Sequence, residues 1–247
     1  MTGQVSFQKA DGVGVIEFYH PQSNSLPSKL LTELEVAIVA AGSDPEVLVI
    51  VLKSSGEKAF CAGASFDELK NIQNEREGHR FFTGFAHVIN AMRRAPKFII
   101  VRVQGKCVGG GLGLVSAGDY CIATDAAEVK LSELGVGLGP FVVGPPVERK
   151  IGLAAFSQLA INATSWQNAE WAKQKGLYTE VYPSIMEMDK GIDALTAFLV
   201  KSNPVAMSDM KKIFWTGTDH WDQLLSYRAT ISGRLVISEF TKKAISK

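Results

Sequence analysis

The feature that most constrains this chain is a run of glycines that follows a predicted buried strand. Residues 98–103 (FIIVRV) are apolar and β-branched over the length of a strand. A turn at residues 104–106 leads to Gly109-Gly110-Gly111-Leu112-Gly113. Glycine lets backbone N–H groups approach a ligand closely, and the first N–H groups of a helix that starts here are unpaired and lie at the positive end of its dipole. The sequence therefore predicts a site for an anion or an oxyanion at this turn.

One carboxylate after the glycine-rich turn, that of Glu133, is a candidate functional group. Residues 120–124 (YCIAT) predict a second strand, and Glu133 stands shortly after it. A lone glutamate is usually a solvated surface group, and glycine clusters usually serve only close packing. A donor-rich turn and an acid within one compact unit nevertheless indicate enolate chemistry, because the donors stabilise a negative oxygen while the acid moves a proton at a neighbouring carbon.

Composition excludes several classes of function. The 247 residues suit one large domain, or one domain with an appendage, and 46% hydrophobic with 21% charged residues is ordinary for a soluble globular protein. A net charge of +1 argues against nucleic acid or an anionic membrane as a partner. Three cysteines and four scattered histidines predict neither a disulfide framework nor a metal site. With no visible membrane span or secretion signal, we expect a cytoplasmic protein.

The N-terminal half alternates strands with amphipathic helices. Strands are expected at residues 5–10 and 13–19, joined as a hairpin at Asp11-Gly12, and at 47–52; helices are expected at 28–41 and 81–92. Residues 57–66 form a second small-residue loop, which leads from the 47–52 strand into a helical stretch. This order is typical of right-handed crossover units in an α/β fold, with a sheet covered on both faces.

The C-terminal third reads as mostly helical. After a rigid segment at residues 140–146, helices are expected at 154–163, 168–175, 185–200, 205–214 and 220–240, with a short strand near 180–183. No low-complexity linker separates this part. We divide the chain into a core at residues 1–185 and a C-terminal helical region at 186–247.

Several motifs together resemble the crotonase (enoyl-CoA hydratase/isomerase) superfamily, over nearly the whole chain. They are His20-Pro21 with Asn24-Ser25-Leu26, Phe60-Cys61-Ala62-Gly63-Ala64, Gly105 to Gly113, Ser132-Glu133, and Gly176-Leu177. The resemblance implies a ClpP/crotonase-like spiral of ββα turns, with two nearly perpendicular sheets and C-terminal helices that form a trimer or a hexamer. In motif, the glycine-rich turn and the Leu131–Leu134 piece are most similar to methylglutaconyl-CoA hydratase-like members.

The resemblance implies a coenzyme A thioester as substrate and no permanently bound cofactor. By motif position, the backbone N–H groups of Ala64 and Gly110 would bind the thioester oxygen, and Glu133 would be the catalytic acid/base. Further substrate and CoA contacts are implied for Ser25, Ala62, Gly63, Ser65, Phe66, Gly109, Gly113, Pro140, Phe141, Phe240 and Lys243. For Phe240 and Lys243, a fraying charged tail is an equally plausible interpretation.

The acid–base residues depart from the family pattern. The best-known hydratases carry two glutamates, and Gly113 stands at the position of the first. Ser65 replaces an aspartate, and residues 140–144 (PFVVG) replace a glycine-rich segment. One glutamate can still hydrate a 2-enoyl-CoA, including branched substrates such as 3-methylglutaconyl-CoA, or dehydrate the product. It can equally shift a double bond as a Δ3,Δ2-enoyl-CoA isomerase. A non-catalytic, RNA-binding relative is the third alternative, and the near-neutral charge speaks against it.

Overall fold

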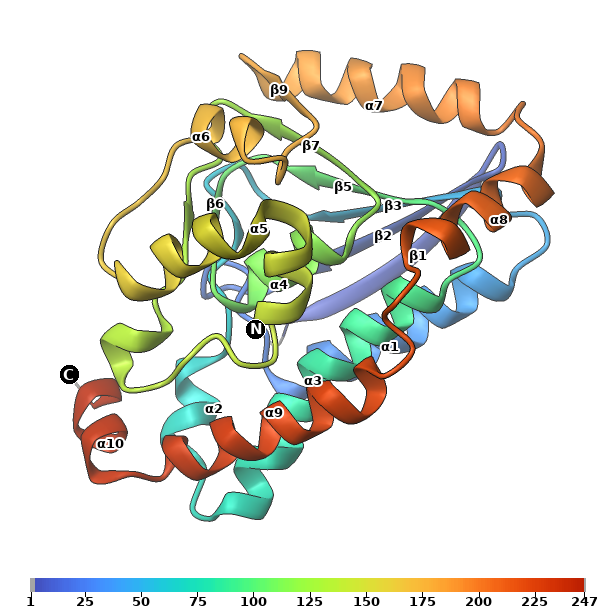
Figure 1. The fold of residues 1–247 in the computed structure, drawn as a ribbon. Coiled ribbons are helices and arrows are strands. Elements are labelled where there is room, and N and C mark those ends of the chain that lie inside the picture. The colour runs from blue at the N-terminus through green and yellow to red at the C-terminus, as the bar shows by residue number, and fades with distance from the viewer. Residues whose placement is uncertain (1–2, 247) are drawn as a thin grey trace.

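The larger of two sheets forms the body of the molecule. The computed structural model describes residues 3–246, and its six-stranded sheet has the order β1-β2-β3-β5-β7-β9. These strands are β1 (Gln4–Ala10), β2 (Val13–Tyr19), β3 (Val49–Ser54), β5 (Ile99–Val103), β7 (Tyr120–Thr124) and β9 (Glu180–Tyr182). The β1–β2 hairpin is antiparallel, and every other pair in the sheet is parallel. The predicted α/β class and crossover topology are confirmed (Figure 1).

A second, three-stranded parallel sheet has the order β4-β6-β8. It is made of β4 (Ala59–Cys61), β6 (Lys106–Val108) and β8 (Val129–Lys130). Each of its strands follows a strand of the large sheet, so the chain passes three times from the large sheet to the small one and on into a helix or turn. This repetition is the expected ββα spiral. The sequence predicts a loop at residues 59–61 and a turn at 104–106. Both predictions were wrong in part, because residues 59–61 and residue 106 belong to strands that are too short to show a periodicity.

The helices cover both faces of the large sheet. They are α1 (Ser28–Ser43), α2 (Phe66–Asn71), α3 (Glu75–Arg94), α4 (Gly110–Ala117), α5 (Gly144–Ile161), α6 (Ala169–Gln174), α7 (Ile185–Leu199), α8 (Pro204–Phe214), α9 (Trp221–Val236) and α10 (Glu239–Ile245), with a 3-10 turn η1 at Glu133–Val136. Helix α7 lies beyond β9, and a cluster that includes Ile100, Ile122 and Met188 fills the space beneath it (Figure 1). None of the helices within residues 3–246 is long and apolar enough to cross a membrane.

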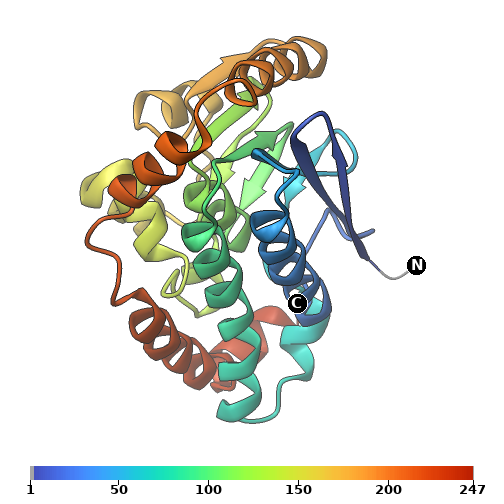
Figure 2. The ribbon, with the colours of Figure 1, turned by 90° about the vertical axis from the view of Figure 1, so that its right-hand side faces the viewer.

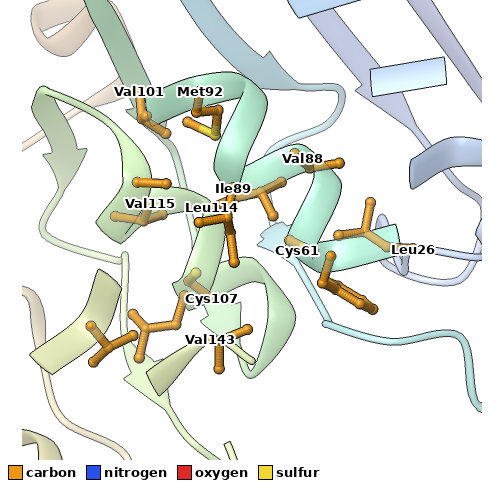
Figure 3. Close-up of a cluster of buried hydrophobic side chains, with 14 of the residues drawn as sticks. Leu26, Cys61, Val88, Ile89, Met92, Val101, Cys107, Leu114, Val115 and Val143 are labelled. Atoms are coloured by element: carbon orange, nitrogen blue, oxygen red, sulfur yellow. The ribbon is translucent and has the colours of Figure 1, made fainter. Parts of the chain in front are cut away.

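Helix α4 is buried at the centre of the main core. Figure 3 shows its Leu114 and Val115 among Ile89 and Met92 of α3 and Val101 of β5. All eight residues of α4 are buried. The glycine-rich turn at its N-terminus lies against α3 and the small sheet, because Gly110 faces Phe85 of α3 and Gly111 faces Cys61 of β4.

Three predicted helix boundaries were wrong, each for a local reason. Helix α3 starts at residue 75 rather than 81, because Asn74 caps a polar first turn that has no apolar periodicity. Helix α5 starts at residue 144 rather than 154. Prolines are tolerated in its first turn because the N–H groups there have no intrahelical partner, and the helix is kinked at Gly152. The helix predicted at 220–240 is two helices, and Ser238 caps the second.

The C-terminal helices pack onto the rest of the chain. Helix α9 lies alongside α3 in both ribbon views, and α10 lies against α2 and η1 (Figures 1 and 2). Apolar side chains of α9 such as Leu225 and Val236 belong to the main core. The boundary that we predict between residues 185 and 186 falls at the start of α7.

Candidate active site

One pocket collects most of the predicted site residues. It has about 590 Å³ of empty space, part of it open to solvent, and mostly apolar walls. The predicted residues that line it are Ala62, Gly63, Ala64, Phe66, Gly109, Gly110, Glu133, Pro140 and Phe141. Its other walls come from α2, α3, the segment 138–143 and α9, so elements from across the chain enclose it.

The first backbone donor stands in the loop after β4. Leu26 donates its N–H to the carbonyl of Gly63 (2.8 Å), and its own carbonyl accepts the N–H of Ser65 (3.3 Å). These two bonds flank Ala64 and hold its backbone in place. Within residues 3–246 the Ala64 N–H donates to no acceptor, so it is available to a ligand in the pocket.

The second donor stands at the start of α4. Gly109 has φ 50° and ψ −113°, a backbone conformation that strongly favours glycine. Its N–H donates to the carbonyl of Lys130 (3.0 Å), and its carbonyl accepts the N–H of Gly113 (3.2 Å). Gly110 is the first residue of the helix, where an N–H has no intrahelical partner, and no acceptor for it exists in the described part of the chain.

The two donor loops touch each other through their glycines. A Cβ placed on Gly63, whose φ is 89°, would lie 3.3 Å from the Gly110 nitrogen. A Cβ on Gly111 would lie 2.6 Å from the Cβ of Cys61. Only glycines allow this approach, and it brings Ala64 and Gly110 to the wall of one pocket. Such an arrangement can stabilise negative charge on a carbonyl oxygen.

Glu133 lies beside this pair of donors. It is the first residue of η1, and a Cβ on Gly109 would lie 2.9 Å from its Oε1 atom. The residue is partly exposed, but its Oε2 atom is buried and has no hydrogen-bond partner among the described residues. Desolvation raises the pKa of Glu133 to about 7, and a hydrogen bond from its own backbone opposes this effect. A carboxyl with this pKa can both accept and donate a proton at neutral pH.

The described pocket lining contains one carboxylate, and Val143 packs against Gly113. A Cβ on Gly113 would lie 2.6 Å from Cγ1 of Val143, so Val143 packs directly over the helix at this point. Of the described residues that line the pocket, Glu133 alone is acidic, and none is a lysine or an arginine. Gly113 itself lies outside the pocket lining, so its contact with the substrate stays a prediction.

Four further predicted residues also lie outside the lining. Ser25 is buried, with its Oγ 2.9 Å from Nδ1 of His20, and Ser65 caps α2 by accepting the Glu68 N–H. Phe240 is 68% exposed and packs over Gly137, and Lys243 is exposed. In the single chain these side chains serve the fold or face solvent, so their contact with CoA stays a prediction.

Sequence reasoning missed several lining residues. Phe82 and Phe85 of α3 belong to an apolar stripe that predicts core packing but does not say that part of the stripe faces a cavity. Ser232 of α9 lines the pocket although nothing in its sequence surroundings distinguishes it. No group of three or more metal-binding side chains occurs in residues 3–246.

Comparisons with known proteins show the family of this chain. The profile of the family described as enoyl-CoA hydratase/isomerase matches residues 8–245. A short-chain-enoyl-CoA hydratase of Clostridium acetobutylicum is 29% identical over 246 residues, which cover 98% of this chain and 93% of that protein. A peroxisomal Delta(3,5)-Delta(2,4)-dienoyl-CoA isomerase of Arabidopsis thaliana is 26% identical over 90% of this chain and 84% of its own length.

Two more comparisons concern the acyl group and the fold. The mitochondrial methylglutaconyl-CoA hydratase of Rattus norvegicus is 33% identical over 74% of this chain and 59% of its own length. The crystal structure of an enoyl-CoA hydratase from Bacillus halodurans superposes with a TM-score of 0.90 at 20% identity, covering 98% of both chains, which shows the fold alone. With a family profile that spans almost the whole sequence, this chain belongs to the enoyl-CoA hydratase/isomerase family of the crotonase superfamily and is an enzyme of hydratase or isomerase type.

Proposed function

We propose that this enzyme adds water to a 2-enoyl-CoA thioester, and in reverse dehydrates a 3-hydroxyacyl-CoA, with Glu133 as its single acid/base. The observation that carries the proposal is the buried, unpartnered Oε2 of Glu133 in the pocket that Ala64 and Gly110 also line. A pKa of about 7 suits both directions of the proton transfer.

The two free backbone N–H groups would bind the thioester oxygen. When water adds at C3, an electron pair moves through C2 to this oxygen, and the donors of Ala64 and Gly110 stabilise the resulting enolate. Removing one donor of an oxyanion hole slows other enzymes by about 10²- to 10³-fold. Because the donors belong to the main chain, held by Leu26 and by the start of α4, they need no rearrangement during the reaction.

The acyl chain would lie among the apolar walls formed by α3 and the segment 138–143. A neutral chain fits this lining, since no described lining residue carries a positive charge. The branched 3-methylglutaconyl-CoA carries a carboxylate on its acyl chain, so the lining favours it less, and it stays in the proposal because of the similarity to the rat methylglutaconyl-CoA hydratase. The CoA moiety would leave the pocket past Ala62 and Phe66, with Ser25, Ser65, Phe240 and Lys243 as proposed outer contacts.

A second candidate function is Δ3,Δ2-enoyl-CoA isomerisation. The observation that favours it is Val143, which occupies the space where a second acid would lie. Isomerisation needs one base that removes a proton from C2 and returns it to C4, and it adds no water. Both candidates use Glu133, Ala64 and Gly110 in the same roles.

The first test replaces Glu133 by glutamine. We expect Glu133→Gln to reduce turnover by about 10²- to 10⁴-fold, the usual contribution of a general acid/base, while CoA binding is retained. Crotonyl-CoA, 3-methylglutaconyl-CoA and 3-hexenoyl-CoA serve as substrates, and mass spectrometry of the products separates the functions. Hydration adds the mass of one water. Isomerisation of 3-hexenoyl-CoA leaves the mass unchanged, so the ultraviolet absorbance of the conjugated 2-enoyl thioester distinguishes it from no reaction.

The exposed Glu170 on α6 provides the matched control. Glu170→Gln removes the same charge far from the pocket lining and is expected to leave turnover unchanged. Normal turnover in Glu133→Gln would refute the assigned role. A wild-type enzyme that shifts the double bond of 3-hexenoyl-CoA but never hydrates crotonyl-CoA would favour the isomerase.

A further inference from the structure

The pocket contains very few side chains that can form hydrogen bonds. Of its described lining residues, three have a polar side chain: Ser132, Glu133 and Ser232. Ser132 precedes Glu133 in the same turn, whereas Ser232 comes from α9, which belongs to the last part of the chain. Ser232 therefore approaches the pocket from a different element than the catalytic carboxyl.

The Ser232 hydroxyl has no partner within residues 3–246. The residue is only 2% exposed, and no hydrogen bond involves its side chain. The neighbouring Thr230 on the same helix shows the contrast, because its hydroxyl donates to the carbonyl of Ser226 whereas the Ser232 hydroxyl forms no such bond. Its Oγ atom is not among the fully buried side-chain atoms without a partner, so it retains access to the space of the pocket. A hydroxyl that faces a pocket in this way can bond a water or a ligand there.

Close helix packing fixes the position of Ser232. A Cβ on the neighbouring Gly233 would lie 2.6 Å from the backbone nitrogen of His79, and a Cβ on Gly78 would lie 2.7 Å from Cα of Gly233. Helices α3 and α9 thus touch backbone to backbone immediately beside Ser232. Phe82 of α3 and Ser232 of α9 both line the pocket.

Hydration requires a water that is held against the substrate by more than one polar group. An ordered water in a protein usually has two to four polar partners. Glu133 supplies one, and the place of a second acid is filled by Val143 over Gly113. We propose that the Ser232 hydroxyl is the second partner and binds the water that adds to C3. This inference rests on the proposed hydratase function.

The reaction then balances with these groups alone. Ser232 holds the water oxygen while the Glu133 carboxylate removes one of the water protons. The oxygen forms a bond to C3, and the electron pair of the C2–C3 double bond moves to the thioester oxygen. Glu133 next delivers the proton to C2 as the enolate collapses. Ser232 keeps its own proton throughout and therefore acts in water addition but not in proton transfer at C2.

The experiment separates these two steps. Hydration of crotonyl-CoA measures water addition. Butyryl-CoA has no double bond to hydrate, so exchange of its C2 protons in D₂O measures proton transfer by Glu133 in the absence of water addition. We expect Ser232→Ala and the near-isosteric Ser232→Cys to lower kcat for hydration by about 10- to 100-fold, the effect of one lost hydrogen bond in a buried site, and to keep the exchange rate within about twofold. Glu133→Gln is expected to lose both activities.

Ser226→Ala is the matched control, since it makes the same deletion on α9 outside the pocket lining and is expected to hydrate normally. Thermal melting confirms that each variant is folded, and the cysteine variant replaces the alanine variant should the latter unfold. Hydration at the wild-type rate in both Ser232 variants overturns the inference and leaves the hydratase function intact. Folded Ser232 variants that lose hydration and exchange equally also overturn the inference. So does the result that Ser132→Ala loses hydration while Ser232→Ala keeps it. A wild-type enzyme that exchanges the C2 protons but never hydrates overturns both the inference and the hydratase function.

Discussion

Burial of the Glu133 carboxyl couples the stability of the fold to pH. Its pKa rises from 4.5 to about 7 because of desolvation, so the folded protein keeps a proton that the unfolded chain has already released. The folded state binds more protons than the unfolded state between these two values, and the free energy of unfolding falls as pH rises through this window. At about 1.4 kcal/mol per pKa unit, ionisation of Glu133 destabilises the fold by up to about 3 kcal/mol above pH 7.

Glu133→Gln is therefore expected to stabilise the protein at alkaline pH. The amide is neutral at every pH, so the variant gains up to about 3 kcal/mol over the wild type at pH 8.5 and far less at pH 5. Urea unfolding at both pH values measures the difference in the free energy of unfolding. Glu170→Gln, at an exposed acid, is the control. An equal effect of Glu133→Gln at the two pH values would show that the carboxyl is not desolvated.

Among the elements, α4 combines a packing role with a site role. Each glycine at its start allows a different contact: Gly109 faces the Glu133 carboxyl, Gly110 faces the ring of Phe85, and Gly111 faces Cys61. A Cβ on Gly110 would lie 2.3 Å from Cε1 of Phe85. The same small residues that leave N–H groups free thus also let the helix fit between α3 and the small sheet.

The contact of α4 with the segment before α5 gives an element-scale prediction. In an exposed helix, Gly→Ala gains about 1 kcal/mol. Here the new Cβ of Gly113→Ala would lie 2.6 Å from Cγ1 and 2.8 Å from Cβ of Val143. We expect overpacking to dominate and to lower the free energy of unfolding by about 1–3 kcal/mol.

A double-mutant cycle checks the cause of this loss. Val143→Gly removes both clashing atoms, so Gly113→Ala is expected to be less destabilising in that background than in the wild type. Urea unfolding of the four proteins measures the coupling. If Gly113→Ala is as stable as the wild type, then Val143 does not fill this space as tightly as the structure shows.

At the scale of the whole molecule, the C-terminal half leaves large apolar side chains in solvent. They are Leu153 and Ile161 on α5, Met210, Ile213 and Phe214 on α8, and Tyr227 on α9. Exposed apolar surface of this kind often marks a protein–protein interface. We propose that the exposed side chains of α8 and α9 belong to such an interface and that residues 186–247 form a homotrimer or a dimer of trimers.

Native mass spectrometry tests the assembly. We expect three or six times the chain mass of 26.7 kDa. Ile213 is 68% exposed on α8, and Ile213→Glu places a charge that an interface would have to desolvate, so this variant is expected to dissociate into smaller species. Val39→Glu makes the same change at a 54% exposed position on α1 and is expected to keep the assembly. A monomeric wild type would contradict the proposal.

The amino-acid sequence alone determined the parts of this protein that depend on short-range chemistry. β-Branched runs gave the main strands, and helical periodicity gave α1 and the C-terminal helices. The resemblance to the crotonase superfamily implied a shared site for Ala64, Gly110 and Glu133, and these residues do line one pocket. The boundaries of α3 and α5 were missed because capping and proline placement, rather than apolar periodicity, decide where those helices begin.

The tertiary structure alone decided which side chains surround Ala64, Gly110 and Glu133. Val143 fills the place of the second acid, Ser232 reaches the pocket through the contact of Gly233 with Gly78, and Phe240 stays outside the lining. Each of these facts depends on segments that are distant in sequence and meet only when the core packs. Local propensity acts over a few residues, whereas the pocket, and with it the raised pKa of Glu133, results from the burial of the whole chain.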